Sequence, residues 1–123
     1  MKEYFSKINE FNKAFNVECS NTPGLIDDFI LRFNLMKEEN EEYLESCIQN
    51  DLVEVLDACV DQMYILLGTI KKHGLEDVFE GAFNEVHLSN MSKLENGEAV
   101  VREDGKIIKG KDYFKPNLAK FLK

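Results

Sequence analysis

The sequence predicts an all-α protein, a bundle of four to five helices that ends in a short β-hairpin. Three observations support this class: apolar residues recur at steps of three and four along four stretches, Gly- or Asn-containing breaks separate these stretches, and two β-prone runs flank an Asp-Gly pair. The 123 residues, of which 44% are hydrophobic and 31% charged, suit one domain. We expect that domain to cover residues 1–123, with a helical core at about 2–93 and a hairpin and tail at about 94–123.

The four helices follow from the apolar spacing and from the residues that interrupt it. They are expected at about residues 2–15, 25–48, 52–72 and 76–91. The Asn-Thr-Pro-Gly stretch at 21–24 ends the first pattern, and Asn50 with Asp51 supplies a turn and the N-cap of the third helix. The third helix ends in basic residues before Gly74, which is typical of a helix C-terminus.

The C-terminal part changes from helical to extended character. Residues 99–102 and 106–109 each contain two neighbouring β-branched residues, and Glu103-Asp104-Gly105 lies between them, so they predict a small hairpin. The tail from Tyr113 to Phe121 is expected to begin extended and to end in a helical turn.

The charge balance disfavours two classes of partner. Fifteen Lys and Arg stand against 23 Asp and Glu, so the net charge of −8 repels the phosphates of nucleic acids and anionic membranes. No apolar run has the length of a signal peptide or a membrane span, so we expect a cytoplasmic protein with no nucleic-acid or membrane partner. The three cysteines form no Cys-x-x-Cys pair, and Cys47 and Cys59, at helical core spacing, are expected to be buried.

Acidic residues on the second helix depart from the pattern of a merely solvated surface. Glu38 and Glu42 continue the stripe that begins with Leu31 and Leu35, so a face that is apolar early in the helix becomes acidic two turns later. Glu39 lies three residues before Glu42 and therefore beside it on the helix surface.

The third helix carries a sharper signal. Asp61 is the only charged residue within 58–70, a segment that is apolar almost all round. Glu54, Asp57 and Asp61 lie within about 60° of one another around the helix. A lone carboxylate in apolar surroundings is costly to bury, which favours a bound cation or a dense set of hydrogen-bond donors.

The two acidic stripes can meet, because the short link between the helices makes them antiparallel neighbours and can bring Glu39 and Glu42 opposite Glu54 and Asp57. Such oxygen ligands suit a hard cation such as Mg²⁺ or Mn²⁺. A di-iron site would need Glu-x-x-His on two helices, and neither histidine has a Glu three residues before it. The pattern alone leaves two interpretations open, a clustered metal site and a solvated acidic face.

These residues resemble the MazG-like, all-α nucleoside triphosphate pyrophosphohydrolases. The signature of that superfamily is Glu-Glu-x-x-Glu on one helix and Glu-x-x-Asp on the next, which Glu38-Glu39-Asn40-Glu41-Glu42 and Glu54-Val55-Leu56-Asp57 match. The stretches 85–93, 102–106 and 109–116 are similar to the phosphoribosyl-ATP pyrophosphohydrolase-like branch, so the resemblance covers about residues 25–118.

The resemblance implies Mg²⁺-dependent cleavage of a nucleotide between its α- and β-phosphorus, with Mn²⁺ as a substitute cation, in a homodimer or a dimer of dimers. It implies metal binding by the two acid pairs, and Glu38 is placed to hold or deprotonate the attacking water. The predicted metal ligands are Glu39, Glu42, Glu54 and Asp57. The candidate substrate contacts are Asp61, Asn90, Lys93, Lys109 and Tyr113.

Two rival functions stay open, a non-catalytic acidic interaction module and a degenerate family member that binds a nucleotide without hydrolysing it. Asp61 lies inside an apolar run, whereas a docking module needs exposed acids, so the sequence favours the enzyme. A homodimer is also expected from the residues, because the third helix is apolar over more of its circumference than four short helices can cover.

Overall fold

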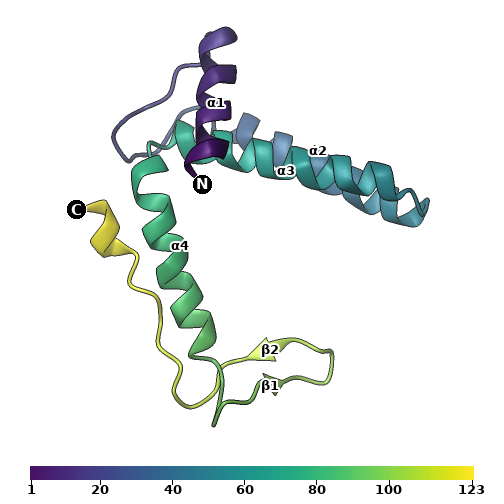
Figure 1. The fold of residues 1–123 in the computed structure, drawn as a ribbon, viewed down its shortest axis with the longest axis vertical. Coiled ribbons are helices and arrows are strands. Elements are labelled where there is room, and N and C mark those ends of the chain that lie inside the picture. The colour runs from purple at the N-terminus through teal and green to yellow at the C-terminus, as the bar shows by residue number, and fades with distance from the viewer. The chain divides into compact units, whose positions relative to one another are not determined.

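The computed structural model describes residues 1–123, which form two compact units, Met1–Glu76 and Asp77–Lys123. Figure 1 shows the helices, the hairpin and the final 3₁₀ helix in chain order. The elements are α1 (Lys2–Ala14), α2 (Phe29–Ile48), α3 (Leu52–Lys72), α4 (Glu76–Met91), β1 (Val100–Val101), β2 (Ile107–Ile108) and the 3₁₀ helix η1 (Ala119–Leu122). The predicted all-α fold with a short C-terminal hairpin is confirmed.

Helices α2 and α3 form an antiparallel pair joined by the predicted turn. Asn50 adopts a left-handed conformation with φ of 54°, and the side chain of Asp51 caps α3 by accepting a hydrogen bond from the Glu54 amide at 3.2 Å. Nearer the middle of the pair, the Gln62 amide donates to the Asn40 side-chain oxygen at 3.1 Å. This bond shows which residues of the two helices lie side by side.

Helix α1 packs across α3 through a small apolar core. Phe5 and Ile8 of α1 are buried, as are Ala58, Leu67 and Ile70 of α3. Burial of one such large side chain contributes about 1.5–3 kcal/mol, so these contacts hold α1 against the helical pair. Figure 1 shows α1 crossing α3 rather than running along it.

The segment between α1 and α2 is bonded to the C-terminal end of α3. The Gly24 amide donates to the His73 carbonyl at 2.9 Å, and His73 Nδ1 lies 2.7 Å from the Gly24 carbonyl oxygen. Gly74 has φ of +69°, and a Cβ on it would lie 2.2 Å from the Thr22 carbonyl oxygen. Gly74 therefore both ends α3 and lets the segment approach it closely.

In the second unit, the C-terminal tail is bonded to α4. The Ser89 hydroxyl donates to the Phe114 carbonyl at 2.8 Å, and the Glu85 carboxylate accepts from the Asn117 amide and from Lys120 Nζ, each at 3.0 Å. Strands β1 and β2 pair antiparallel, and Gly105 has φ of +88° in the turn that joins them. The hairpin and the final helical turn are thus where the sequence predicted them.

Two expectations about local structure are wrong. Helix α2 begins at Phe29, not near residue 25, because Asp28 takes the N-cap position, and Leu25 is 98% exposed. Cys47 and Cys59 are exposed, not buried, because core spacing buries a side chain only where another element covers that helix face. No helix combines the length and the apolar character needed to span a bilayer.

Candidate functional site

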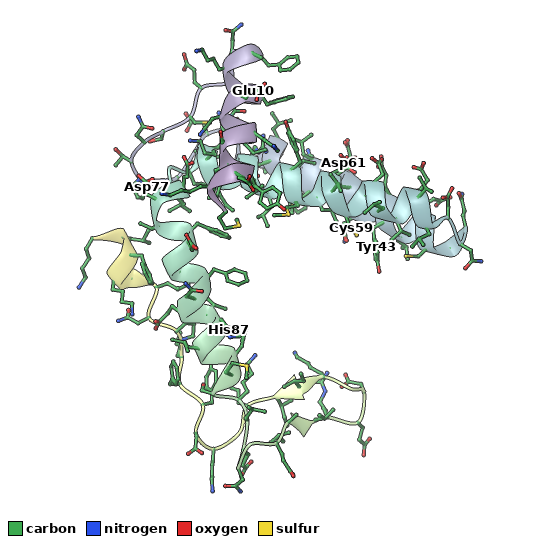
Figure 2. The ribbon with its side chains drawn as sticks, in the orientation of Figure 1. Glu10, Tyr43, Cys59, Asp61, Asp77 and His87 are labelled. Carbon is green, nitrogen blue, oxygen red and sulfur yellow. The ribbon has the colours of Figure 1, made fainter.

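The pairing of α2 with α3 brings acidic residues from both helices together. Carboxylate oxygens of Glu39, Glu42 and Asp61 all lie within 4.8 Å of one another. We call these three residues the acid cluster. Figure 2 shows Asp61 on one side of the paired helices and Cys59 with Tyr43 on the other, so the cluster occupies a single face of the pair.

The helix register explains why Asp61 completes this cluster. The Asn40–Gln62 bond places the two residues side by side, so in an antiparallel pair Asp61 lies at a level between Glu39 and Glu42. Asp57 is one turn away along α3, about 6 Å, whereas Glu54 is seven residues away, about 10 Å. The structure therefore brings Asp61 to the two glutamates and leaves Glu54 outside the cluster.

The cluster is electrostatically strained without a cation. Glu39 Oε2 is buried and has no hydrogen-bond partner. Burial, a hydrogen bond shared with Glu42, and the charges of Glu42, Asp61 and Asp57 raise the pKa of Glu39 to about 7. Burial also raises the pKa of Asp61, and the charges of Asp57 and Glu42 add to that effect.

The donor set of the cluster fits a hard divalent cation. All three side chains are carboxylates, and Mg²⁺ and Mn²⁺ prefer oxygen ligands. The unpartnered Glu39 oxygen is an acceptor with no donor, which is the arrangement that a bound cation satisfies. Asp57 adds negative charge beside the cluster, because it acts on both Glu39 and Asp61.

The other acids of the two motifs are exposed. Glu38 is an exposed neighbour of Glu39 on α2, and Glu54 and Asp57 are exposed on α3. The backbone amide of Glu54 donates a hydrogen bond to the side chain of Asp51, the N-cap residue of that helix. The roles of Glu38, Glu54 and Asp57 stay predictions. Of these three residues, Asp57 is the one whose charge raises the pKa of Glu39 and of Asp61.

The remaining predicted residues lie in the second unit, at the end of α4 and in the segment that follows the hairpin. Asn90 is exposed, and its carbonyl accepts from the Lys93 amide at 3.1 Å. Lys93 and Lys109 line one pocket of about 490 Å³ together with Lys106. Lys109 Nζ lies 4.8 Å from the centroid of the Tyr113 ring. Lys93, Lys109 and Tyr113 are thus neighbours, and Lys106 is a basic residue that sequence reasoning did not single out.

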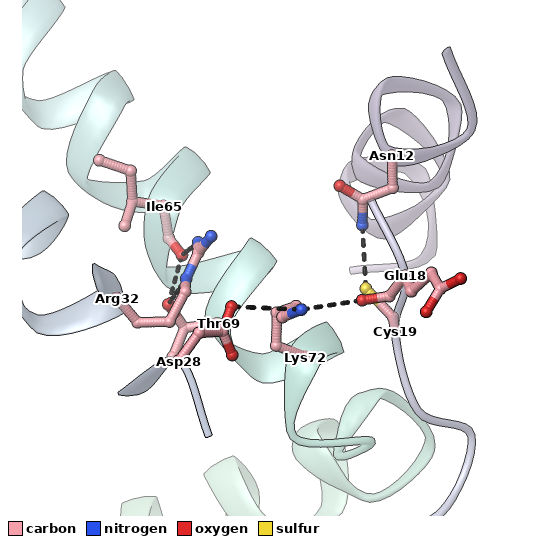
Figure 3. Close-up of polar contacts among 8 residues, drawn as sticks. All are labelled: Asn12, Glu18, Cys19, Asp28, Arg32, Ile65, Thr69 and Lys72. Carbon is pink, nitrogen blue, oxygen red and sulfur yellow. Dashed lines mark hydrogen bonds and ion pairs between the residues drawn. The ribbon is translucent and has the colours of Figure 1, made fainter. Parts of the chain in front are cut away.

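Sequence reasoning also missed Arg32 of α2. Its guanidinium donates from Nε to the Thr69 hydroxyl and from Nη2 to the Ile65 carbonyl, each at 3.0 Å (Figure 3). Burial lowers the pKa of Arg32, although the charge of Asp28 opposes that effect. A signal was present, because Arg32 lies two turns before Glu39 and therefore on nearly the same face of α2.

Comparison with known proteins identifies a protein family whose model matches this chain. A family model described as phosphoribosyl-ATP pyrophosphohydrolase matches residues 8–90, a range that holds both acidic motifs, Asp61 and Asn90. The chain is also 26% identical over 102 residues to an uncharacterized protein of Acanthamoeba polyphaga mimivirus. That alignment covers 78% of this chain and 41% of the viral protein, so the chain spans about two-fifths of that relative's length.

Proposed function

Because the chain belongs to the phosphoribosyl-ATP pyrophosphohydrolase family, within the MazG-like all-α superfamily, we propose that it hydrolyses a nucleotide between the α- and β-phosphates. The products are a nucleoside monophosphate, or the corresponding phosphoribosyl compound, and pyrophosphate. We place this activity in the cytoplasm and assign it to residues 1–123 as one domain. The observation that carries the proposal is the acid cluster with its buried, unpartnered Glu39 oxygen, in a chain that matches this family.

Glu39, Glu42 and Asp61 are the residues that would hold Mg²⁺, with Mn²⁺ as a substitute. When bound, the cation would supply positive charge against the phosphate oxygens during cleavage. Asp57 is next to this set and stays a predicted ligand, as does Glu54 from the second motif. The raised pKa of Glu39 means that cation binding below about pH 7 must displace a proton from the cluster.

Glu38 is the proposed catalytic residue. It is exposed and lies about 100° round α2 from Glu39, so its carboxylate can accept a proton from the attacking water. The water oxygen bonds to the α-phosphorus, the bond from that phosphorus to the α–β bridging oxygen breaks, and pyrophosphate leaves with the bridging oxygen. The proton passes to Glu38, which returns it to solvent.

The same proposal includes a homodimer or a dimer of dimers. In the single chain, α3 leaves a set of large apolar side chains in solvent, with exposed fractions from 54% to 80%. They are Leu52, Val53, Leu56 and Val60. A second copy that covers this face would bury it on both subunits through one twofold contact.

A nucleotide screen tests the proposed function. The purified protein is incubated with Mg²⁺ and each common ribo- and deoxyribonucleoside triphosphate, and with phosphoribosyl-ATP. Phosphate is then measured with and without added inorganic pyrophosphatase. We expect phosphate only when pyrophosphatase is present, and none in EDTA. Phosphate release without pyrophosphatase, or no release from any nucleotide, would contradict the assignment.

A further inference from the structure

A cavity of about 230 Å³ lies among α1, α2 and α3, beside the acid cluster. Its walls are largely apolar and include Phe11 of α1, Leu35 of α2 and Tyr64 of α3, and Asn12 and Arg32 add polar groups to the lining. Pockets for whole small-molecule ligands usually measure about 300–1,000 Å³. This cavity is therefore suited to a fragment of a nucleotide rather than to all of it.

The cavity is lined in part by α2 and α3, the same two helices that carry the acid cluster. Leu35 lies one turn before Glu39 on α2, and Tyr64 lies one turn after Asp61 on α3. The cavity and the cluster are thus about one helical turn apart, roughly 6 Å along the pair. A nucleotide whose phosphates lie at the cluster has its ribose and base within reach of the cavity.

Arg32 lines this cavity, and one edge of its guanidinium already donates hydrogen bonds within the protein. Nε and Nη2 form one side of the group, and they donate to Thr69 and to the Ile65 carbonyl (Figure 3). Of the five N–H groups of an arginine, this leaves a pair at the outer end, one on each Nη, without a partner in the chain. Gly68 permits the placement, because a Cβ there would lie 2.8 Å from Nη2.

The charges around the cavity do not favour a phosphate inside it. Lys72 also lines the cavity, but its Nζ is paired with the Asp28 carboxylate at 3.3 Å and donates to the Glu18 carbonyl at 3.0 Å (Figure 3). The Lys72 charge is thus already paired, and Arg32 is the cationic group that offers a pair of free donors there, in surroundings that are mostly apolar. A flat, uncharged ring with acceptors on its edge fits this lining better than an anion does.

We propose that this cavity binds the nucleobase of the substrate and that Arg32 is its specificity-determining residue, reading a base edge with two neighbouring acceptors. The best match is the O6 and N7 edge of guanine, which takes two parallel N–H groups of an arginine. Adenine presents an amino group in place of O6, so one donor of Arg32 would face another donor. This proposal rests on the proposed function, because it supplies the base for a nucleotide whose phosphates lie at the acid cluster.

The matched nucleotides GTP and ATP test the proposal. We expect the wild-type protein to favour GTP in kcat/KM by roughly 5- to 150-fold, the discrimination typical of a bidentate arginine–guanine contact. Arg32→Lys keeps the positive charge but removes the paired donors, so the ratio should fall toward one. Arg102→Lys, at the other arginine of the chain, is the matched control and should leave the ratio unchanged.

A binding measurement separates the failure of this proposal from the failure of the proposed function. GMP and AMP are titrated into the metal-free wild-type protein by calorimetry, and the ring signals of Phe11 and Tyr64 are followed by NMR. GMP should bind more tightly by a similar factor and shift both rings, whether or not any nucleotide is hydrolysed. Equal affinities, or shifts confined to other residues, would overturn the proposal even if hydrolysis of nucleotides is established.

Discussion

Replacing Glu39 by Gln should stabilise the metal-free protein at high pH while removing its response to Mg²⁺. The pKa of Glu39 is raised from its ordinary 4.5 to about 7. The folded protein therefore binds the Glu39 proton more tightly than the unfolded chain, and this contribution to stability is complete below about pH 4.5 and is lost as the pH rises through 7. Above pH 7, the folded wild-type protein must carry the charge of Glu39 beside Glu42 and Asp61.

The magnitude follows from the size of the shift. One pKa unit corresponds to about 1.4 kcal/mol, so the shift of Glu39 amounts to about 3.5 kcal/mol at most, and solvent screening reduces the measurable part to about 1–2 kcal/mol. Glutamine has nearly the shape of a protonated glutamate and never ionises. The variant should therefore match the wild type near pH 4 and exceed its free energy of unfolding by about 1–2 kcal/mol near pH 8.5.

Urea unfolding, followed by circular dichroism in EDTA at the two pH values, measures this difference. Glu41→Gln is the control, because Glu41 is exposed on the same helix and only a surface ion pair with Lys37 at 4.0 Å is lost. Added Mg²⁺ at about ten times its Kd should stabilise the wild type by about 1.4 kcal/mol and leave Glu39→Gln unchanged. A variant less stable than the wild type near pH 8.5 in EDTA would show that the charge of Glu39 does not destabilise the folded protein.

Further predictions concern the metal ligands, the basic pocket, the pH dependence and the assembly. Asp61→Asn should lower kcat and Mg²⁺ affinity by roughly 100-fold or more, and Glu54→Gln should be the milder change, since only Asp61 belongs to the cluster; equal losses measured by titration and kinetics would contradict this order. Lys93→Ala should raise KM with little change in kcat, and an unchanged KM would remove Lys93 from substrate binding. Calorimetry in buffers of different ionisation enthalpy should show proton release on Mg²⁺ binding at about pH 6 that vanishes by about pH 9, because of the raised pKa of Glu39. Light scattering should give two or four times the 14.2-kDa chain mass, and a folded, active monomer at micromolar concentration would argue against the dimer.

Local chemistry made most of the fold predictable. Asp51 caps α3 and Gly74 ends it, as their residue types indicate, because a cap needs only a side-chain acceptor and a left-handed turn needs only glycine. The hairpin turn at Gly105 follows the same logic. The predicted start of α2 at Leu25 is wrong, because the apolar spacing extends N-terminal of Phe29, the residue at which the helix begins.

The composition of the candidate site was less predictable, because it depends on tertiary register. The short link predicts that α2 and α3 are antiparallel, but the level at which Glu39 meets α3 depends on how the two helices pack, and one turn of difference exchanges Asp57 for Asp61. The sequence places Arg32 on nearly the same face of α2 as Glu39, but its approach to α3 depends on the small Gly68 of the facing helix, which no local pattern shows.

³¹P NMR of the reaction products tests whether the acid cluster supports cleavage between the α- and β-phosphates. The substrate is the best nucleoside triphosphate of the screen, with Mg²⁺, and the wild type, Glu39→Gln and Glu41→Gln are compared at equal concentration. We predict that the wild type and Glu41→Gln produce nucleoside monophosphate and pyrophosphate in equal amounts, and that Glu39→Gln is slower by roughly 100-fold or more. Nucleoside diphosphate with orthophosphate as products, or a Glu39→Gln rate equal to that of the wild type, would contradict this role of the acid cluster.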